Sequence, residues 1–408
     1  MKHAGQWYMK IETDKEGSDM QMLSAMVDIP GFRVVQVQCE ESSVFLSVES
    51  EVEHGLCPRC GMVSHHVRVW YPRCIRDLPI SGNACYLLWD RRYFDCAQCH
   101  TTFPEPLTFV DEKRNYTRRY EVDIFEQVRQ TTATYVAARE GLTDKVVTRI
   151  FARQAHARLP EQPLCDVTKL GIDEIAEHKG RNAYDLLFYN LETGIPVEVL
   201  ENRTQAELLR YLAALPEAIR ASIDEVCIDM WRPYATAVLE QLPQATLVTD
   251  RFHVMKAVNQ ELKSLKNTLK PDLPDDAKAC HYPLLKNAVD LSETQQEILN
   301  NVYEASPQLK DAHQLKEAFR EVFDTEYTVE QGAEAVQGWI EKAEQAGCFS
   351  EAVKTIKNWF TSIVNYFRHR TTNGPAEGVN NKVKVIKRMA YGFRNFANFR
   401  LRILTAFL

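Results

Sequence analysis

The sequence predicts a mixed α/β protein in which a small β-rich metal-binding domain and a helix-turn-helix precede a larger α/β part with a long helical segment. Three observations carry this prediction. Two Cys-x-x-Cys pairs bracket short strand-like runs between residues 57 and 99. Helical periodicity replaces strand alternation over residues 112–160. Strands and helices then alternate over residues 168–249, before an almost wholly helical stretch that extends to about residue 367.

The length of 408 residues is enough for roughly two to four domains. A hydrophobic content of 45% and a charged content of 26% are ordinary for globular proteins, which excludes a largely disordered chain. We find no apolar run of about 18 residues and no secretory signal, so we expect neither a membrane span nor export. The first twenty residues are interpreted as an addition to the natural chain, or as the stretch before a later start at Met20 or Met22.

The distribution of charge favours a DNA-binding protein although the net charge is −7. Residues 113–158 hold ten Lys/Arg and five Asp/Glu, and residues 378–408 hold seven Lys/Arg and no acid. Residues 271–350 hold six basic and sixteen acidic residues. Basic segments separated by an acidic one suit DNA binding with an acidic accessory domain. The alternative is an ordinary surface with uneven charge.

Two cysteine pairs predict a structural zinc site. Each pair places two thiolates on one tight turn, and two such turns supply the four sulfurs that zinc prefers. The 35 residues between the pairs are interpreted as strands inserted into an elaborated zinc ribbon. A redox Cys-x-x-Cys would need a thioredoxin-like context, which we do not find. Eleven cysteines without an export signal also favour reduced thiols. The predicted ligands are Cys57, Cys60, Cys96 and Cys99; Cys74 and Cys85 have no paired partner, and His54, His65, His66 and His100 remain possible substitutes.

Residues 133–151 predict a helix, a glycine turn and a second helix. Gly141 permits the turn, and Thr143 is positioned to cap the second helix. The apolar positions of this second helix lie on one face, which leaves a polar face for the major groove of DNA. The alternative is a simple helical hairpin. The predicted DNA contacts are Lys145, Thr148, Arg149 and Arg153.

Two aspartates are expected at the ends of apolar strands, and this placement predicts a metal-dependent active site. Asp173 follows Leu-Gly-Ile, and Asp229 follows Val-Cys-Ile. A carboxylate at the end of a buried strand is unfavourable unless metal ions or hydrogen bonds satisfy it. Two such carboxylates on adjacent strands can hold two Mg²⁺ ions, which would activate the attacking oxygen and stabilise the leaving one in phosphoryl transfer. The alternative is that each aspartate only caps a strand end.

A third acid, Glu377, is expected in the first turn of a helix that starts near Pro375 and is capped by Thr372 or Asn373. Basic residues follow it and suit phosphate contacts. A solvated amphipathic helix is the alternative. The basic residues are Lys382, Lys384, Lys387 and Arg388.

Other residues near these acids are candidates for the wall of the cleft. Asp250 and His253 follow a further strand, and Trp231 follows Asp229 closely. An aromatic side chain beside the metal ions could stack on a displaced base. Core packing of Trp231, Phe252 and His253 is an equally good interpretation.

Several motifs, taken in order, make the chain resemble a known family. They are Cys57-x-x-Cys60 with Cys96-x-x-Cys99, Gly171-Ile-Asp-Glu, Ile228-Asp-Met-Trp-Arg-Pro-Tyr, Asp250-Arg-Phe-His-Val, Asn373-Gly-x-x-Glu-Gly-x-Asn-Asn-x-x-Lys and Tyr391-Gly-Phe-Arg-Asn-Phe. With them, residues 45–408 resemble the DDE transposases of bacterial insertion sequences, in particular the ISL3 group. The resemblance implies an RNase H-like mixed sheet with an all-α insertion. Its acidic triad would be Asp173, Asp229 and Glu377, with two Mg²⁺ ions that Mn²⁺ can replace.

The domains expected on these grounds are an N-terminal strand segment, a zinc-binding domain, a helix-turn-helix, and a catalytic core interrupted by helices: 1–44, 45–110, 111–162, 163–260 with 361–408, and 261–360. The leading function is a transposase that binds terminal inverted repeats, cuts the element ends and joins the 3′-hydroxyls to target DNA. A domesticated DNA-binding regulator and a nuclease that cuts without joining are the alternatives. We expect DNA as partner, a homodimer or larger assembly on DNA, and a cytoplasmic location at the bacterial nucleoid.

Overall fold

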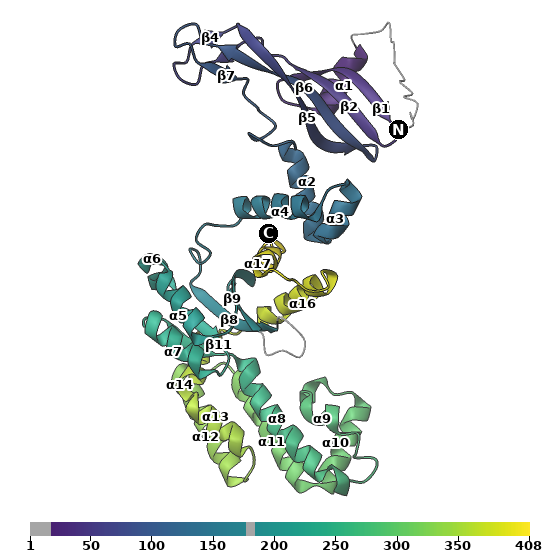
Figure 1. Ribbon diagram of the computed structural model, residues 1–408. Coiled ribbons are helices and arrows are strands. Elements are labelled where there is room, and N and C mark those ends of the chain that lie inside the picture. Colours follow the sequence, from purple (N-terminus) through teal and green to yellow (C-terminus); the bar gives the residue numbers. More distant parts are fainter. Residues whose placement is uncertain (1–17, 177–183) are drawn as a thin grey trace. The chain divides into compact units, whose positions relative to one another are not determined.

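The computed structural model describes residues 18–176 and 184–408 (Figure 1). The chain divides after Arg158 into two compact units, each of which has its own sheet. In the described ranges, no helix is both long enough and apolar enough to cross a membrane.

A mixed sheet forms most of the N-terminal unit, with strand order β1-β2-β6-β5 and β7 paired to β6. Along β2, alternate side chains are buried, and Leu46 is fully enclosed. A helix that the sequence analysis did not predict, α1, packs Val27 against this sheet. The expected boundary between residues 44 and 45 falls inside β2, because β1 and β2 belong to the same sheet as β5 and β6. The elements are α1 (Ser18–Val27), β1 (Phe32–Glu40), β2 (Ser43–Ser50), β5 (Val67–Ile80), β6 (Asn83–Asp95) and β7 (Thr102–Pro104).

The strands between the two cysteine pairs form one long hairpin, β5–β6, which turns at Ser81 and Gly82 with φ values of 51° and 83°. Short strands β3 (Gly55–Leu56) and β4 (Val63–Ser64) pair beside it. The β-rich zinc-binding domain with inserted strands is therefore confirmed.

Helices α2 (Arg118–Gln130), α3 (Ala133–Glu140) and α4 (Asp144–Arg158) confirm the predicted helix-turn-helix. Gly141 ends α3 with a φ of 65°, a left-handed value that glycine adopts without strain. The hydroxyl of Thr143 accepts a hydrogen bond from the N–H of Val146 at 3.4 Å, as its predicted capping role requires.

Buried ion pairs attach the helix-turn-helix to strand β5. Arg76 on β5 pairs with Glu140 of α3 at 3.5 Å, and Tyr120 of α2 donates to the same carboxylate at 3.0 Å. Asp77 on β5 pairs with Arg119 of α2. Since Glu140 and Asp77 are both almost fully buried, loss of either partner would leave an uncompensated charge. These contacts therefore hold sheet and helices in one unit.

The C-terminal unit is built on a five-stranded sheet of order β10-β9-β8-β11-β12. The first three strands are antiparallel neighbours, and β11 and β12 run parallel to β8. This mixed sheet confirms the RNase H-like core. The strands are β8 (Lys169–Ala176), β9 (Tyr184–Asn190), β10 (Ile195–Leu200), β11 (Glu225–Ile228) and β12 (Thr246–Thr249).

Helices cover both faces of this sheet. On β9, Leu186 and Phe188 pack in the cluster that includes α5 and α7, whereas Leu187 and Tyr189 pack with α16 and α17. The alternation follows from the two-residue period of a strand. The covering helices are α5 (Gln205–Ala214), α6 (Glu217–Ser222), α7 (Arg232–Gln241), α16 (Gly374–Met389) and α17 (Phe396–Thr405).

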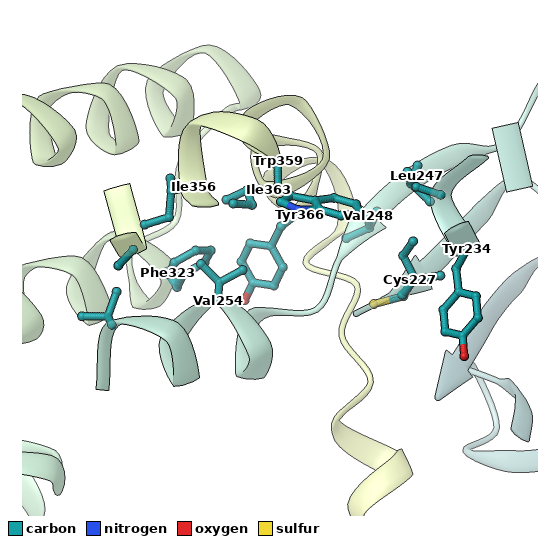
Figure 2. Packing of buried hydrophobic residues seen from close by; sticks show 14 of the residues in the cluster. Cys227, Tyr234, Leu247, Val248, Val254, Phe323, Ile356, Trp359, Ile363 and Tyr366 are labelled. Carbon is teal, nitrogen blue, oxygen red and sulfur yellow. The ribbon is translucent and has the colours of Figure 1, made fainter. Parts of the chain in front are cut away.

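An all-α segment between β12 and α16 is the predicted insertion. Its helices share the core of the sheet: Val254 lies near Phe323 and Tyr366, and Val248 of β12 belongs to the same cluster (Figure 2). The helical segment, residues 251–369, is wider than the expected 261–360 at both ends. Its helices are α8 (Arg251–Leu269), α9 (His281–Leu285), α10 (Glu293–Ala305), α11 (Pro307–Asp324), α12 (Val329–Gln345), α13 (Ser350–Asn358), α14 (Phe360–Val364) and α15 (Tyr366–His369), with 3₁₀ turns at Lys270–Asp272 and Ala288–Asp290.

Candidate active site

Three aspartates lie at one level on adjacent parallel strands. Cys227 of β11 is opposite Gly171 of β8, so two residues further Asp229 is opposite Asp173. Ile228 is opposite Thr249 of β12, so Asp250 is the next position at the same level. The carboxyl ends of parallel strands share one edge of a sheet, and ligands of open α/β sheets bind there. The register therefore puts the three carboxylates level with one another, although β8 continues to Ala176, so Asp173 lies within its strand and does not end it as the sequence predicted.

Asp173 is anchored to helix α16 through Asn380. The amide of Asn380 donates to Asp173 Oδ2 at 2.8 Å, and the Tyr189 hydroxyl donates to the amide oxygen of Asn380 at 3.0 Å. Asp173 Oδ1 accepts the N–H of Glu174 at 2.8 Å. This chain of hydrogen bonds sets the orientation of the Asp173 carboxylate. Sequence reasoning did not single out Asn380, although it lies three residues after Glu377, on the same side of a helix.

Two buried carboxylates hold the segment that leads into α16. At the start of β11, Glu225 contacts His369 and accepts the Thr371 hydroxyl at 2.5 Å. At the end of β12, Asp250 accepts the Thr372 hydroxyl at 3.0 Å and the Asn373 N–H at 3.1 Å. Neither Thr372 nor Asn373 caps α16 with its side chain, contrary to the expectation, because Asp250 engages the Thr372 hydroxyl and the Asn373 amide bonds to β8.

Asp229 is the least satisfied carboxylate at this edge. Its Oδ1 is buried and has no hydrogen-bond partner. Burial, followed by the negative charge of Glu174, raises the pKa of Asp229 to about 6. Burial opposes a positive charge on His253, but its 3.2 Å contact with Asp250 and the charges of Asp229 and Asp173 outweigh burial and raise the pKa of His253. An orphaned oxygen among like charges fits the carboxylate shell of a hard divalent cation.

The pKa of Asp229 makes stability depend on pH in magnesium-free buffer. The pKa of Asp229 is about 6 in the folded protein, above its usual value of 3.8. Protonation of Asp229 therefore stabilises the folded state; this stabilisation is complete below about pH 4 and is lost as the pH rises through 6. We expect the free energy of unfolding of Asp229→Asn to exceed that of the parent by roughly 3 kcal/mol at pH 7.5, with a correspondingly higher unfolding temperature, and the difference should shrink towards pH 4.5. Thermal melts at both pH values check this. A variant that is less stable than the parent at pH 7.5 would contradict it.

Glu377 lies in the first turn of α16 by its backbone; its side chain lies outside the described residues. Asn373, just before the helix, bonds to the carbonyl of Ile172, and Asn380 bonds to Asp173. Position 377 is four residues after Asn373 and three residues before Asn380. Helical spacing therefore puts its backbone on the side of α16 that meets β8.

A pocket of about 380 Å³ has Tyr184, Arg203 and Trp231 in its lining. Arg203 pairs with Glu174 at 2.7 Å and lies over the rings of Tyr184 and Trp231, at 4.4 and 5.0 Å from their centroids. Trp231 is only partly buried, so it lines this pocket as well as packing on Tyr234. Sequence reasoning found Trp231 but not Arg203, which no local motif marks.

The predicted DNA contacts on α4 differ in their availability. Lys145 and Arg149 are exposed one turn apart, and Thr148 is half-buried beside them. Arg153 instead pairs with the buried Glu121 of α2, so its charge is already engaged within the unit. His156, which sequence reasoning missed, is exposed and continues the face of Lys145 and Arg149 by helical spacing.

The basic residues of α16 also divide into two groups. Lys384 and Arg388 are exposed one turn apart, while Val383 and Ile386 pack inward. Lys382 donates to the carbonyl of Ala406 and lies over the ring of Phe407, and Lys387 is half-buried.

The four predicted zinc ligands come together at the open end of the β5–β6 hairpin, opposite its turn. Their sulfurs all lie within 4.8 Å of one another, and Cys57–Cys99 and Cys60–Cys96 are each 3.5 Å apart. Zinc–sulfur bonds of about 2.3 Å in a tetrahedron place the sulfurs about 3.8 Å apart, so the cluster fits zinc. Cys85 lies in the core of the sheet and Cys74 is exposed, so neither belongs to this cluster.

Three family models match consecutive parts of the chain. Residues 53–99 match the zinc-finger of transposase IS204/IS1001/IS1096/IS1165, and residues 105–155 match the helix-turn-helix domain of transposase family ISL3. Residues 170–403, more than half of the chain, match the transposase domain of DDE type of the same family.

Two individual relatives that are named transposases agree with these matches. The transposase of insertion sequence element IS1001 from Bordetella parapertussis is 26% identical over 95% of this chain and 98% of its own length. The transposase of IS1557 from Mycobacterium tuberculosis is 27% identical over 56% of this chain and 58% of its own. A Lactococcus lactis protein named ATP-dependent protease is 31% identical over 42% of this chain and 57% of its own.

Proposed function

This chain belongs to the ISL3 family of transposases, and we propose that it binds the terminal inverted repeats of an insertion sequence, cuts at the element ends and joins the 3′-hydroxyls to target DNA. The observation that carries the proposal is the shared level of Asp173, Asp229 and Asp250 at one edge of the sheet, with α16 anchored to the same edge. No serine, cysteine or histidine nucleophile is required for chemistry at such a site.

The catalytic acids in this proposal are Asp173, Asp229 and Glu377. Two Mg²⁺ ions held by them, or Mn²⁺ in their place, would activate the attacking oxygen and stabilise the leaving one. Asn380 orients the Asp173 carboxylate, and Asp250 holds the start of the helix that carries Glu377.

Two further residues line the cleft in this proposal. His253, which contacts Asp250 at 3.2 Å, is assigned to the part of the cleft near the scissile phosphate. Trp231 offers a ring on which a displaced base can stack.

DNA binding is assigned to the helix-turn-helix and to the exposed basic face of α16. In α4, Lys145, Arg149 and Thr148 would contact the repeat, with Arg153 acting mainly through Glu121. In α16, Lys384 and Arg388 are the exposed phosphate contacts, with Lys382 and Lys387 beside them. An element has two ends to be processed together, so we propose a homodimer or a larger assembly on DNA.

Replacing both exposed cations of α4 tests this assignment. Each lost phosphate contact makes the dependence of log Kd on log salt concentration shallower by about 0.9. We expect Lys145→Gln with Arg149→Gln to reduce the slope for end DNA by roughly two units. The control is Arg33→Gln with Arg210→Gln, which removes the same charge from exposed positions elsewhere. A slope equal to that of the control would show that α4 does not contact the DNA backbone.

Cleavage and joining of DNA that carries the inverted repeats flanking the gene test the function as a whole. We expect strand cuts at the repeat ends and covalent insertion into a target plasmid, both dependent on Mg²⁺. Specific binding without cuts would instead identify a regulator. Cuts without joined products would identify a nuclease of the same fold.

A further inference from the structure

Helix α8 carries an exposed basic face in an otherwise acidic insertion. Six exposed residues recur every three or four positions from the first turn of α8 to its C-cap, so they share one face, and none of them is acidic: Phe252, Lys256, Gln260, Lys263, Asn267 and Lys270. The opposite face is buried through Val254, Val258 and Leu262. In the described ranges none of these three lysines forms an ion pair. The face therefore presents uncompensated positive charge.

Only one acid occurs on α8, and it is turned to another helix. The Glu261 carboxylate accepts the N–H of Ala352 at 2.9 Å and that of Glu351 at 3.4 Å, at the start of α13. Carboxylates are favourable at the N-terminus of a helix, where the N–H groups have no partner. Glu261 is therefore engaged in capping and does not neutralise the lysines.

Positive charge also accumulates where α8 meets α9. Burial and then the charges of Lys266, Lys263 and Lys270 lower the pKa of His281, and no acid is among the groups that act on it. Lys266 Nζ lies 3.3 Å from His281 Nδ1. The neighbouring Tyr282 is 72% exposed. Like charges gathered without an acid repel each other, and a polyanion relieves that repulsion.

The N-terminal end of this face, at Phe252, lies close to Asp250 of the candidate active site. Phe252 is 64% exposed, and its ring lies 5.4 Å from that of His253, which contacts Asp250. At 19 residues, α8 is about 28 Å long, or roughly eight base pairs of duplex. The segment from residue 271 to 350 holds sixteen acidic against six basic residues and would repel DNA elsewhere. A duplex at the acids would therefore be drawn along α8.

We propose that the exposed face of α8 binds the phosphate backbone of the donor DNA that flanks the element, beyond the scissile phosphate. This rests on the proposed function. Lysine, glutamine and asparagine side chains contact phosphates without reading bases in this arrangement. Flanking DNA differs at every insertion site, so only contacts of that kind can hold it.

The test compares end DNA that carries a flank with end DNA trimmed at the cleavage site. For full-length Lys256→Gln, Lys263→Gln, Lys270→Gln protein, we expect the salt dependence of log Kd to become shallower by roughly three units on flanked DNA and to stay parental on trimmed DNA. The matched control is Lys310→Gln, Lys342→Gln, Lys354→Gln, which removes three exposed lysines from α11, α12 and α13. Unchanged thermal melts would show that both variants fold.

The possible outcomes separate this proposal from the function on which it rests. The proposal for α8 is overturned if the salt dependence of log Kd on flanked DNA is the same for the variant and the control. It is also overturned if the variant changes this salt dependence equally on flanked and trimmed DNA. Normal binding of flanked DNA with poor joining of trimmed ends to a target plasmid overturns it in favour of target DNA as the occupant. A parent protein that does not bind end DNA overturns the proposed function as well.

Discussion

Asp173→Asn, Asp229→Asn and Glu377→Gln are each expected to reduce cleavage and joining at least about 10³-fold, because each removes a charge from the proposed site of the metal ions. The substitutions keep the shape of the side chain. Binding of end DNA should stay within about twofold of the parent, since we assign it mainly to the helix-turn-helix and the basic face of α16. Gel-resolved cleavage products and equilibrium binding measure the two effects separately.

The control for this series is Asp224→Asn, an exposed acid just before β11 on the same sheet. It changes the net charge equally and should keep parental rates. Mn²⁺ should support the reaction in the parent, and Ca²⁺ should support binding without turnover. A Glu377→Gln protein that cleaves at nearly the parental rate would contradict the triad, and would point to Asp250 or Glu174 as the third acid.

Loss of the zinc site is expected to unfold the end of the N-terminal unit that holds the cysteines. Apart from the ligands themselves, the core there consists mainly of Phe94 and Phe103, so little apolar burial remains without metal. In zinc fingers, metal binding contributes roughly 10 kcal/mol or more to folding. Cys57→Ser should therefore lose zinc and lose protection from hydrogen exchange over residues 53–66.

Cys74→Ser is the matched control, because Cys74 is exposed and lies outside the four-sulfur cluster. It should retain about one zinc per chain by elemental analysis, with parental exchange. A parent protein without zinc, or a Cys57→Ser protein with unchanged metal content and exchange, would refute the zinc site.

The domains with strong local signals could be predicted from sequence. The thiolates of Cys57 and Cys60 share one tight turn, and Gly141 with Thr143 marks a helix boundary by the chemistry of glycine and of a hydroxyl cap. Asp173 and Asp229 were found because each follows a short apolar run, and charge is unfavourable in such a place. In each case the physical cause acts within a few residues.

Contacts between distant segments could not be predicted in this way. Asp250 holds the chain before α16 through Thr372 and Asn373, across 122 and 123 positions of sequence. Local reasoning expected Thr372 or Asn373 to cap that helix instead. It also treated Arg153 as a free cation, whereas burial of Glu121 on another helix makes it an ion-pair partner.

Short spacings and periodicities were sufficient to predict the zinc ribbon, the helix-turn-helix, the mixed sheet and the family. Which acids lie level with one another could be seen only after folding, since that depends on the register of β8, β11 and β12. The tertiary structure likewise decided that the lysines of α8 are uncompensated while Glu261 is engaged with α13. Charge and burial are properties of neighbours in space, and a chain brings those neighbours together only when it folds.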